Sequence, residues 1–291
     1  MNQGMGPTES TISEHTRKAY ATDWAHYTRW CRLNGHPTLP PSVAHIENYL
    51  TDLSRSSQLA SSSLRRRRAG IVWNYRQRGF DLEIQSTPLP DTVTALPTHQ
   101  VQRPATKEAI TPQEMRAMLA TLPYDLRGLR DRAMLLVGYI GGLRRSEIIG
   151  LDASPDRSDD SMGGLEFRDN FLRVTIEART EVRTVTLHRG TSAQTCPVHS
   201  VQQWLHFAKI EAGPVFVRTS RDGKRALSAR LNDRHIPRLI KSTVLRSGIR
   251  ADLPENERLA LFSGQSLRVA SAKLATADNR VDLNLTRALG F

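Results

Sequence analysis

The sequence predicts a mainly helical protein with a small antiparallel sheet, divided into an N-terminal helical domain and a C-terminal α+β domain. Three observations predict this class. Apolar residues recur at three- and four-residue steps in both halves of the chain, while residues 165–187 alternate as strands do. Residues 86–107 contain four prolines and lose this periodicity. We place the helical domain at 1–98, a linker at 99–110 and the α+β domain at 111–291.

The N-terminal domain is expected to contain three helices. The first runs from Ser13 to about Leu33, and Pro40-Pro41-Ser42 introduces the second. A third is capped by the serines at 61–63 and continues to about Arg78. Their apolar faces predict a small bundle with its own core. The residues expected to form these faces are Ala19, Tyr20, Trp24, Tyr27, Trp30, Cys31, Val43, Ile46, Tyr49, Leu50 and Leu53.

The third helix is strongly basic. No acidic residue occurs between Arg55 and Phe80, and its consecutive arginines spread around the helix axis. Arginine at this density is typical of a surface that contacts phosphates, and the alternative is a solvated basic face. The predicted nucleic-acid-binding residues are Arg65, Arg66, Arg67, Arg68, Arg76 and Arg78.

The charge of the whole chain indicates a polyanionic partner. It contains 41 basic and 29 acidic residues, a net charge of +12, and all but six of the basic residues are arginines. A base composition that favours arginine codons explains the choice of arginine over lysine, but not the excess over acids. A nucleic acid is the partner that this excess favours.

The cysteine content and the N-terminal residues indicate the cellular compartment of the protein. Cys31 and Cys196 are too few and too isolated for a disulfide framework or a zinc site, which indicates buried thiols in a reducing compartment. Residues 1–10 lack the apolar core of a signal peptide, and no later run approaches membrane-spanning length. We therefore expect a cytoplasmic, nucleoid-associated protein without membrane contact.

The α+β domain is expected to open with a capped helix. Thr111-Pro112-Gln113-Glu114 is a capping signature with proline at the first helical position. A longer helix from Leu126 to Ile140 is ended by Gly141-Gly142, and a short helix follows from Arg144 through Gly150.

Strands and further helices follow in the second half. Asp169-Asn170 and the stretch 178–181 are expected to be turns, with Leu172, Val174 and Ile176 on one face of the sheet. Later helices are predicted at Pro197–Ile210, Leu231–Gly248, Gln265–Ala277 and Val281–Leu289.

Two arginine motifs stand far apart in this domain, Gly142-Leu143-Arg144-Arg145-Ser146-Glu147 and Ser266-Leu267-Arg268. Guanidiniums are planar, multidentate donors, so two of them brought together clamp one phosphate. Arg144 also stands at the positive end of the short helix. Taken singly, the first motif is an ordinary helix start with an i, i+3 ion pair and Arg268 is a surface arginine. The inference therefore rests on their joint order.

The order of these elements resembles the tyrosine recombinase, or phage integrase, family over essentially the whole chain, most closely its Cre and Xer type. Thr16–Tyr20, Asp23-Trp24 and Trp30-Cys31 resemble the opening of the SAM-like core-binding domain of that family. The stretch Gly142–Glu147 resembles its first catalytic arginine motif. Phe262–Arg268 resembles its second, which normally reads His-x-x-Arg.

The resemblance implies a chemistry. In this family a tyrosine attacks the scissile phosphate and forms a 3′-phosphotyrosyl intermediate without metal or nucleotide cofactor, so no cofactor is expected here. Two arginines, implied to be Arg144 and Arg268, hold the nonbridging oxygens, with Glu147 as an orienting carboxylate. A hairpin lysine protonates the leaving oxygen and a histidine assists proton transfer.

Three of the catalytic positions implied by the resemblance differ from the pattern of the family. Arg179 stands in the hairpin turn where lysine is expected, and arginine is the poorer proton donor. Gln265 replaces the histidine, which retains hydrogen bonding but loses titration near neutral pH. Phe291 falls where the family places a histidine or tryptophan.

The last tyrosine in the sequence is Tyr139, and the chain stops before the segment expected to supply the nucleophile and the tail that docks on a neighbouring subunit. We therefore expect a monomeric DNA-binding protein of DNA recombination and integration systems that clamps duplex DNA but cannot cut it alone. One alternative is a fragment of an active recombinase, or a subunit complemented by a full-length partner. Another is a repurposed regulatory DNA-binding module. The histidines show no ligand spacing, so no metal site is expected.

Overall fold

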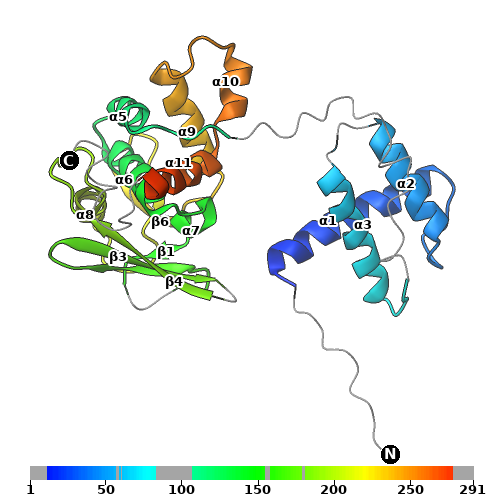
Figure 1. The fold of residues 1–291 in the computed structure, drawn as a ribbon. Helices are drawn as coiled ribbons and strands as arrows, with labels where there is room; N and C mark the ends of the chain where they lie inside the picture. The colour runs from blue at the N-terminus through cyan, green and yellow to red at the C-terminus, as the bar shows by residue number, and fades with distance from the viewer. Residues whose placement is uncertain are drawn as a thin grey trace, which may run out of the picture. The chain divides into compact units, whose positions relative to one another are not determined.

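The structure is a computed structural model that describes residues 12–56, 59, 61–82, 107–154, 158–178 and 181–277. It contains two compact units, Met1–Pro104 and Ala105–Phe291 (Figure 1). The division falls within the expected linker at 99–110, of which residues 99–106 lie outside the described part. No helix among the described residues is long and apolar enough to cross a membrane.

The first unit contains the three predicted helices, α1 (Glu14–Leu33), α2 (Val43–Ser56) and α3 (Ser61–Arg76). Helix α1 begins where predicted because the Ser13 Oγ accepts the backbone N–H of Thr16 at 3.0 Å, an N-cap that satisfies a free donor of the first turn. Helix α3 ends two residues earlier than expected.

Aromatic side chains form the core of this unit. Tyr27, Tyr49 and Tyr75 are fully buried, and the Tyr75 hydroxyl donates to the Thr38 carbonyl at 2.7 Å, so its polar end is satisfied. The prediction that Val43 belongs to the apolar face is wrong, because its side chain is 40% exposed at the first position of α2. Buried positions of the unit, in addition to the tyrosines, are Cys31, Ile46, Leu50, Leu64, Ile71, Val72 and Leu82.

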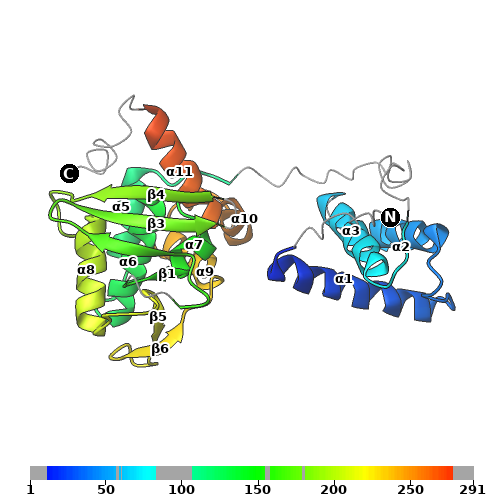
Figure 2. The same ribbon diagram turned by 90° about the horizontal axis from the view of Figure 1, so that it is seen from below.

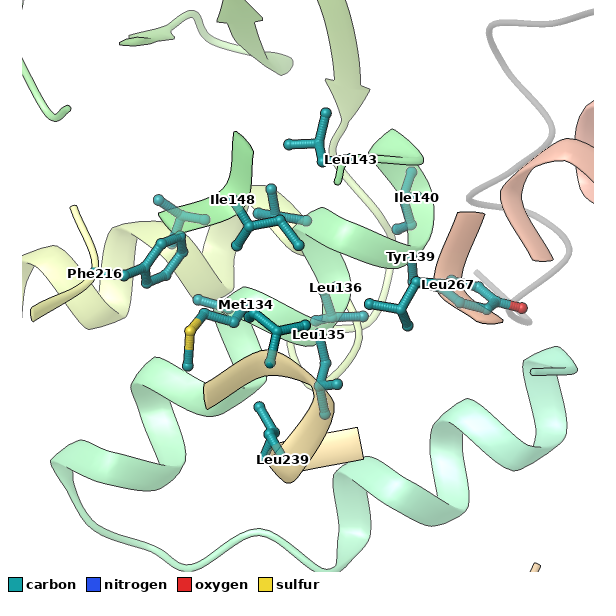
Figure 3. Packing of buried hydrophobic residues seen from close by; sticks show 14 of the residues in the cluster. Met134, Leu135, Leu136, Tyr139, Ile140, Leu143, Ile148, Phe216, Leu239 and Leu267 are labelled. Atoms are coloured by element: carbon teal, nitrogen blue, oxygen red, sulfur yellow. The ribbon is translucent and has the colours of Figure 1, made fainter. Parts of the chain in front are cut away.

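The second unit is built around α6 (Leu126–Gly141), which lies in the middle of its core (Figure 3). The Asp125 side chain caps this helix by accepting the Gly128 N–H at 2.8 Å. Gly142 ends it in a left-handed conformation, with φ +59°, as expected of a glycine C-cap. The preceding helix α5 (Pro112–Ala120) has the predicted capping box between Thr111 and Glu114.

A four-stranded sheet covers one side of α6. Its order is β1 (Leu151–Asp152), β2 (Gly163–Phe167), β3 (Phe171–Ala178) and β4 (Glu181–His188). Strand β1 is parallel to β2, and the other pairs are antiparallel. Leu172, Val174 and Ile176 are buried as predicted, and the sheet contacts α6 and α8 (Pro197–Ala208), as Figure 2 shows.

The remaining elements differ in part from the predictions. A hairpin of β5 (Val217–Thr219) and β6 (Ala226–Arg230) and a short helix α10 (Glu255–Leu261) were not expected. Helix α9 (His235–Arg246) begins four residues after the predicted start, and the Leu231 N–H donates to the Phe216 carbonyl at 2.8 Å. Helix α11 (Gly264–Ala277) agrees with its prediction. The helix expected at Val281–Leu289 lies outside the described residues.

The second unit also begins earlier than the predicted boundary at 111. The Glu108 N–H donates to the Leu261 carbonyl at 3.0 Å, and Ile110 is buried in the core. Glu108 also pairs with Arg250. Residues 107–110, which the sequence assigned to the linker, therefore belong to this unit.

Candidate phosphate-binding site

Arg144 lies between the C-terminal end of α6 and the short helix α7 (Arg145–Ile149), at the N-cap position of α7. The glycine C-cap of α6 turns the chain, and the buried side chains of Leu143 and Ile148 hold the segment against the core. The Arg144 side chain is 57% exposed. A rigid local backbone therefore presents this guanidinium to solvent.

The Glu147 carboxylate is buried beneath Arg144, with 2% of its side chain exposed. It accepts the Arg144 backbone N–H at 2.6 Å through Oε2 and the Arg144 Nη1 at 2.9 Å through Oε1. The first bond satisfies a donor that a helix start leaves free. The second restricts the orientation of the guanidinium.

A residue that was not predicted from the sequence completes this cluster. Arg183 on β4 donates from Nη2 to Glu147 Oε2 at 2.6 Å. Side chains two residues apart on a strand lie on the same face of the sheet. Arg183 therefore lies on the face that Val185 and Leu187 turn toward the helices, next to α7. One buried carboxylate thus holds two guanidiniums. The pattern in the sequence that could have indicated Arg183 was its inward register.

The second arginine motif lies beside the first. On α11, an added Cβ at Gly264 would lie 3.8 Å from the Arg145 Cβ, and Ser271 donates to the Ile140 carbonyl at 3.3 Å. Arg268 is four residues after Gly264 and three before Ser271, so it shares their side of α11. Helix α11 packs against α6, and Figure 1 shows it next to α7. Its side chain is exposed, and among the described residues it has no hydrogen bond or ion pair.

The other predicted positions of this site are placed differently. Gln265 is exposed at the start of α11, where its backbone N–H donates to the Ser263 Oγ at 3.2 Å. Arg179 and Phe291 lie outside the described residues. Arg145, next to Arg144, points elsewhere and pairs with Asp233 at 3.0 Å.

The predicted basic helix of the first unit, α3, uses some of its arginines internally. Arg66 forms an ion pair with Asp23, which is buried in the first unit. Burial raises the pKa of Asp23 above its usual value, and the charges of Arg66 and Arg67 only partly oppose this effect. The Arg67 Nη1 donates to the Tyr49 hydroxyl at 2.9 Å. Both arginines therefore stabilise the unit itself.

Two more of the predicted arginines also have partners within the unit. Arg78 lies over the Trp24 ring at 4.3 Å from its centroid, and its Nη1 donates to the Asn74 carbonyl at 2.6 Å. Arg76 is 3.5 Å from Asp81. Arg65 is exposed on α3. The six arginines are thus not equivalent as candidates for phosphate contact.

Relatives of this chain are recombinases. No family model matches the chain. An integrase/recombinase XerD homologue from Selenomonas ruminantium is 27% identical over 286 residues, which cover 96% of this chain and 79% of that protein. The tyrosine recombinase XerD of Xanthomonas axonopodis pv. citri (strain 306) is 29% identical over 211 residues, which cover 71% of this chain and 60% of that protein.

Two crystal structures share the fold. XerH site-specific recombinase bound to palindromic difH substrate, a post-cleavage complex, gives a TM-score of 0.54 at 15% identity and covers 95% of this chain and 72% of that one. A lambda integrase dimer bound to a COC′ core site gives a TM-score of 0.54 at 16% identity and covers 97% and 86%. This chain is therefore similar in sequence to proteins named as XerD-type recombinases, and it is similar in fold to a site-specific recombinase and an integrase.

Proposed function

We propose that this chain binds duplex DNA through its arginines, and that these 291 residues alone form no covalent link to DNA. The observation that carries the first part is the orientation of Arg144 by a buried carboxylate beside the exposed Arg268 helix face. Donors held in place before the ligand arrives cost less entropy when they bind a phosphate. The net charge of +12 supports the same partner.

The tyrosines support the second part of the proposal. Tyr139 is fully buried in the core, and burial raises its pKa well above the usual value, so its hydroxyl is neither accessible nor easily deprotonated. Tyr124 is fully exposed but precedes α6, whose 16 residues span about 24 Å before Arg144 is reached. Neither tyrosine of the second unit suits in-line attack at Arg144.

The tyrosines of the first unit are equally unsuited. Tyr27, Tyr49 and Tyr75 are buried and have hydrogen-bond partners in its core. The Tyr20 ring is partly buried and contacts the Trp73 ring, with centroids 5.8 Å apart. Without an attacking group, oriented arginines bind a phosphate but cannot transfer it.

DNA binding is tested by fluorescence anisotropy with a labelled duplex taken from the sequence that flanks its own gene. Because each neutralised phosphate releases counterions, log affinity should fall linearly with log salt, with a slope of about −0.9 per contacted phosphate. A slope near zero would contradict phosphate-dominated binding. Competitor duplex of unrelated sequence separates specific from nonspecific binding.

Covalent chemistry is tested with a nicked suicide substrate and a denaturing gel. The chain alone is expected to give no protein–DNA adduct, and an adduct would reject the second part of the proposal. The same assay with a full-length recombinase added tests complementation. An adduct that forms only in the mixture, and that is lost with Arg144→Ala in this chain, would favour a subunit whose partner supplies the tyrosine.

A further inference from the structure

Arg144 and Arg183 meet at one carboxylate although they come from different elements. Arg144 precedes α7 and uses Glu147 Oε1, while Arg183 comes from β4 and uses Oε2. Because both oxygens belong to one carboxyl group, the two guanidiniums are only a few ångströms apart. They form one cluster of charge rather than two separate ion pairs.

The cluster carries an uncompensated positive charge. One buried carboxylate balances one cation, and Glu147 has two. The second guanidinium adds repulsion between like charges, which is costly for groups that are partly removed from water. An anion that contacts both guanidiniums would remove this cost, so the cluster is suited to a further negative charge.

Both guanidiniums retain unused donors that solvent can reach. A guanidinium has five N–H donors, and the side chains of Arg144 and Arg183 remain 57% and 35% exposed. Each uses one side-chain nitrogen on Glu147. The carboxylate therefore fixes both groups while it leaves donors for a tetrahedral anion.

We infer that Arg183 contacts the same DNA phosphate as Arg144 and is a further cation of this site, in addition to Arg144 and Arg268. The inference rests on the proposed DNA binding and deepens it. The sequence prediction assigned the cationic contact of the hairpin to Arg179 in the turn. The inference assigns it to Arg183 on β4, near the end of the β3–β4 hairpin. Arg183 acts here by charge and hydrogen bonding, and no proton transfer is assigned to it.

The test measures duplex affinity against salt for the full chain and four variants. These are Arg183→Gln, Arg144→Gln, the double variant, and Arg189→Gln as a matched control. Arg189 follows the far end of β4, where it donates to the Asp169 carbonyl at 2.7 Å, so its loss removes an equal charge away from Glu147. Thermal unfolding of each variant verifies that the fold is retained.

Arg183→Gln is expected to lower affinity roughly tenfold, as for the loss of a hydrogen bond to a charged group. The control should stay near wild type. The affinity of the double variant should fall by a much smaller factor than the product of the two single-variant factors. The slope of log affinity against log salt should become shallower by about 0.9, the value for one phosphate. The shared contact would be overturned if the two losses of binding free energy added fully and the salt slope changed by the value for two phosphates. It would also be overturned if Arg183→Gln bound duplex as tightly as the control variant.

Two further outcomes are decisive. If Arg183→Gln does not fold, Arg183→Lys replaces it in the same cycle with Arg144→Gln, because lysine retains the charge but lacks the planar fork. Additive losses in that cycle overturn the inference, and non-additive losses support it. A wild-type chain whose binding does not respond to salt rejects the proposed function, and the role of Arg183 is rejected with it.

Discussion

Arg183 donates a 2.6 Å hydrogen bond to Glu147, which joins the sheet to the short helix that follows α6. The two residues are 36 positions apart in the chain. The bond therefore fixes the end of β4 relative to Arg144, the neighbour of Glu147 in the same cluster. Stability of the second unit and geometry of the candidate site depend on the same carboxylate.

Replacing Glu147 should consequently destabilise the second unit. In Glu147→Gln two guanidiniums remain close without their shared anion, and we expect a loss of about 1–3 kcal/mol, below the value for a fully buried pair because both arginines are partly exposed. Urea unfolding followed by the fluorescence of Trp204, which lies in this unit, measures the loss. Glu166→Gln removes a half-exposed carboxylate that also holds two arginines, and should cost under about 1 kcal/mol.

Gly142 should be required for the geometry of the site. Its φ of +59° disfavours other residues, and an added Cβ would lie 2.9 Å from the Ser271 Oγ on α11. Gly142→Ala is expected to cost about 1–3 kcal/mol and to weaken DNA binding, because it displaces α11 from the Arg144 segment. Gly213→Ala provides the comparison, since Gly213 has φ +72° with open space around it. Equal losses in the two variants would show that backbone strain alone accounts for the effect.

The arginines of α3 should separate into two groups. Arg66→Gln leaves the buried Asp23 without its ion pair and should destabilise the first unit by about 2 kcal/mol. Arg65→Gln should leave the stability unchanged, because Arg65 is exposed. It should instead lower the affinity for DNA and reduce the salt dependence of binding. Unfolding followed by fluorescence of the tryptophans and duplex binding by anisotropy give the two readings. Similar stability losses for both variants would contradict the distinction.

The same pair predicts a pH dependence. Burial raises the pKa of Asp23 in the folded state, so the favourable contribution of this group is complete below the ordinary value of 3.8 and is lost as pH rises through the folded pKa. Removing Arg66 takes away a charge that opposes the increase. The loss of unfolding free energy in Arg66→Gln should therefore be larger at pH 7 than at pH 4. If wild type and variant differed by the same free energy across this range, Asp23 would not be ionised at pH 7.

Sequence patterns predicted the elements that have strong local signals. The capping box at Thr111, the glycine at 142 and the alternation around Val174 each determine backbone conformation within a few residues. The β5–β6 hairpin lacked such a signal, because β6 is mostly exposed. Arg183 was missed for a different reason. Its importance depends on Glu147, a partner that only the tertiary fold brings near.

Arg230 illustrates how such a distant partner stabilises an element that the sequence did not indicate. From β6 its Nη2 donates to the buried Asp152 carboxylate at 2.7 Å and its Nη1 to the Ile149 carbonyl at 2.8 Å. Asp152→Asn should destabilise the second unit by about 3 kcal/mol at pH 7, because it removes the buried charge that faces Arg230. Asp160→Asn removes an exposed partner of the same arginine and should cost under about 1 kcal/mol.

The loss in Asp152→Asn should also depend on pH in the direction opposite to that of Asp23. Burial of Asp152 favours its neutral form, but hydrogen bonds from Ser158 and Arg230 outweigh burial and lower its pKa below the usual 3.8. The stabilisation is therefore present above pH 3.8 and is lost as pH falls through the lower folded pKa. Urea unfolding of wild type and variant between pH 7 and pH 3 should show a constant difference that shrinks only at the acidic end. A difference that already shrinks between pH 7 and pH 5 would mean that Asp152 is not the ionised partner of Arg230.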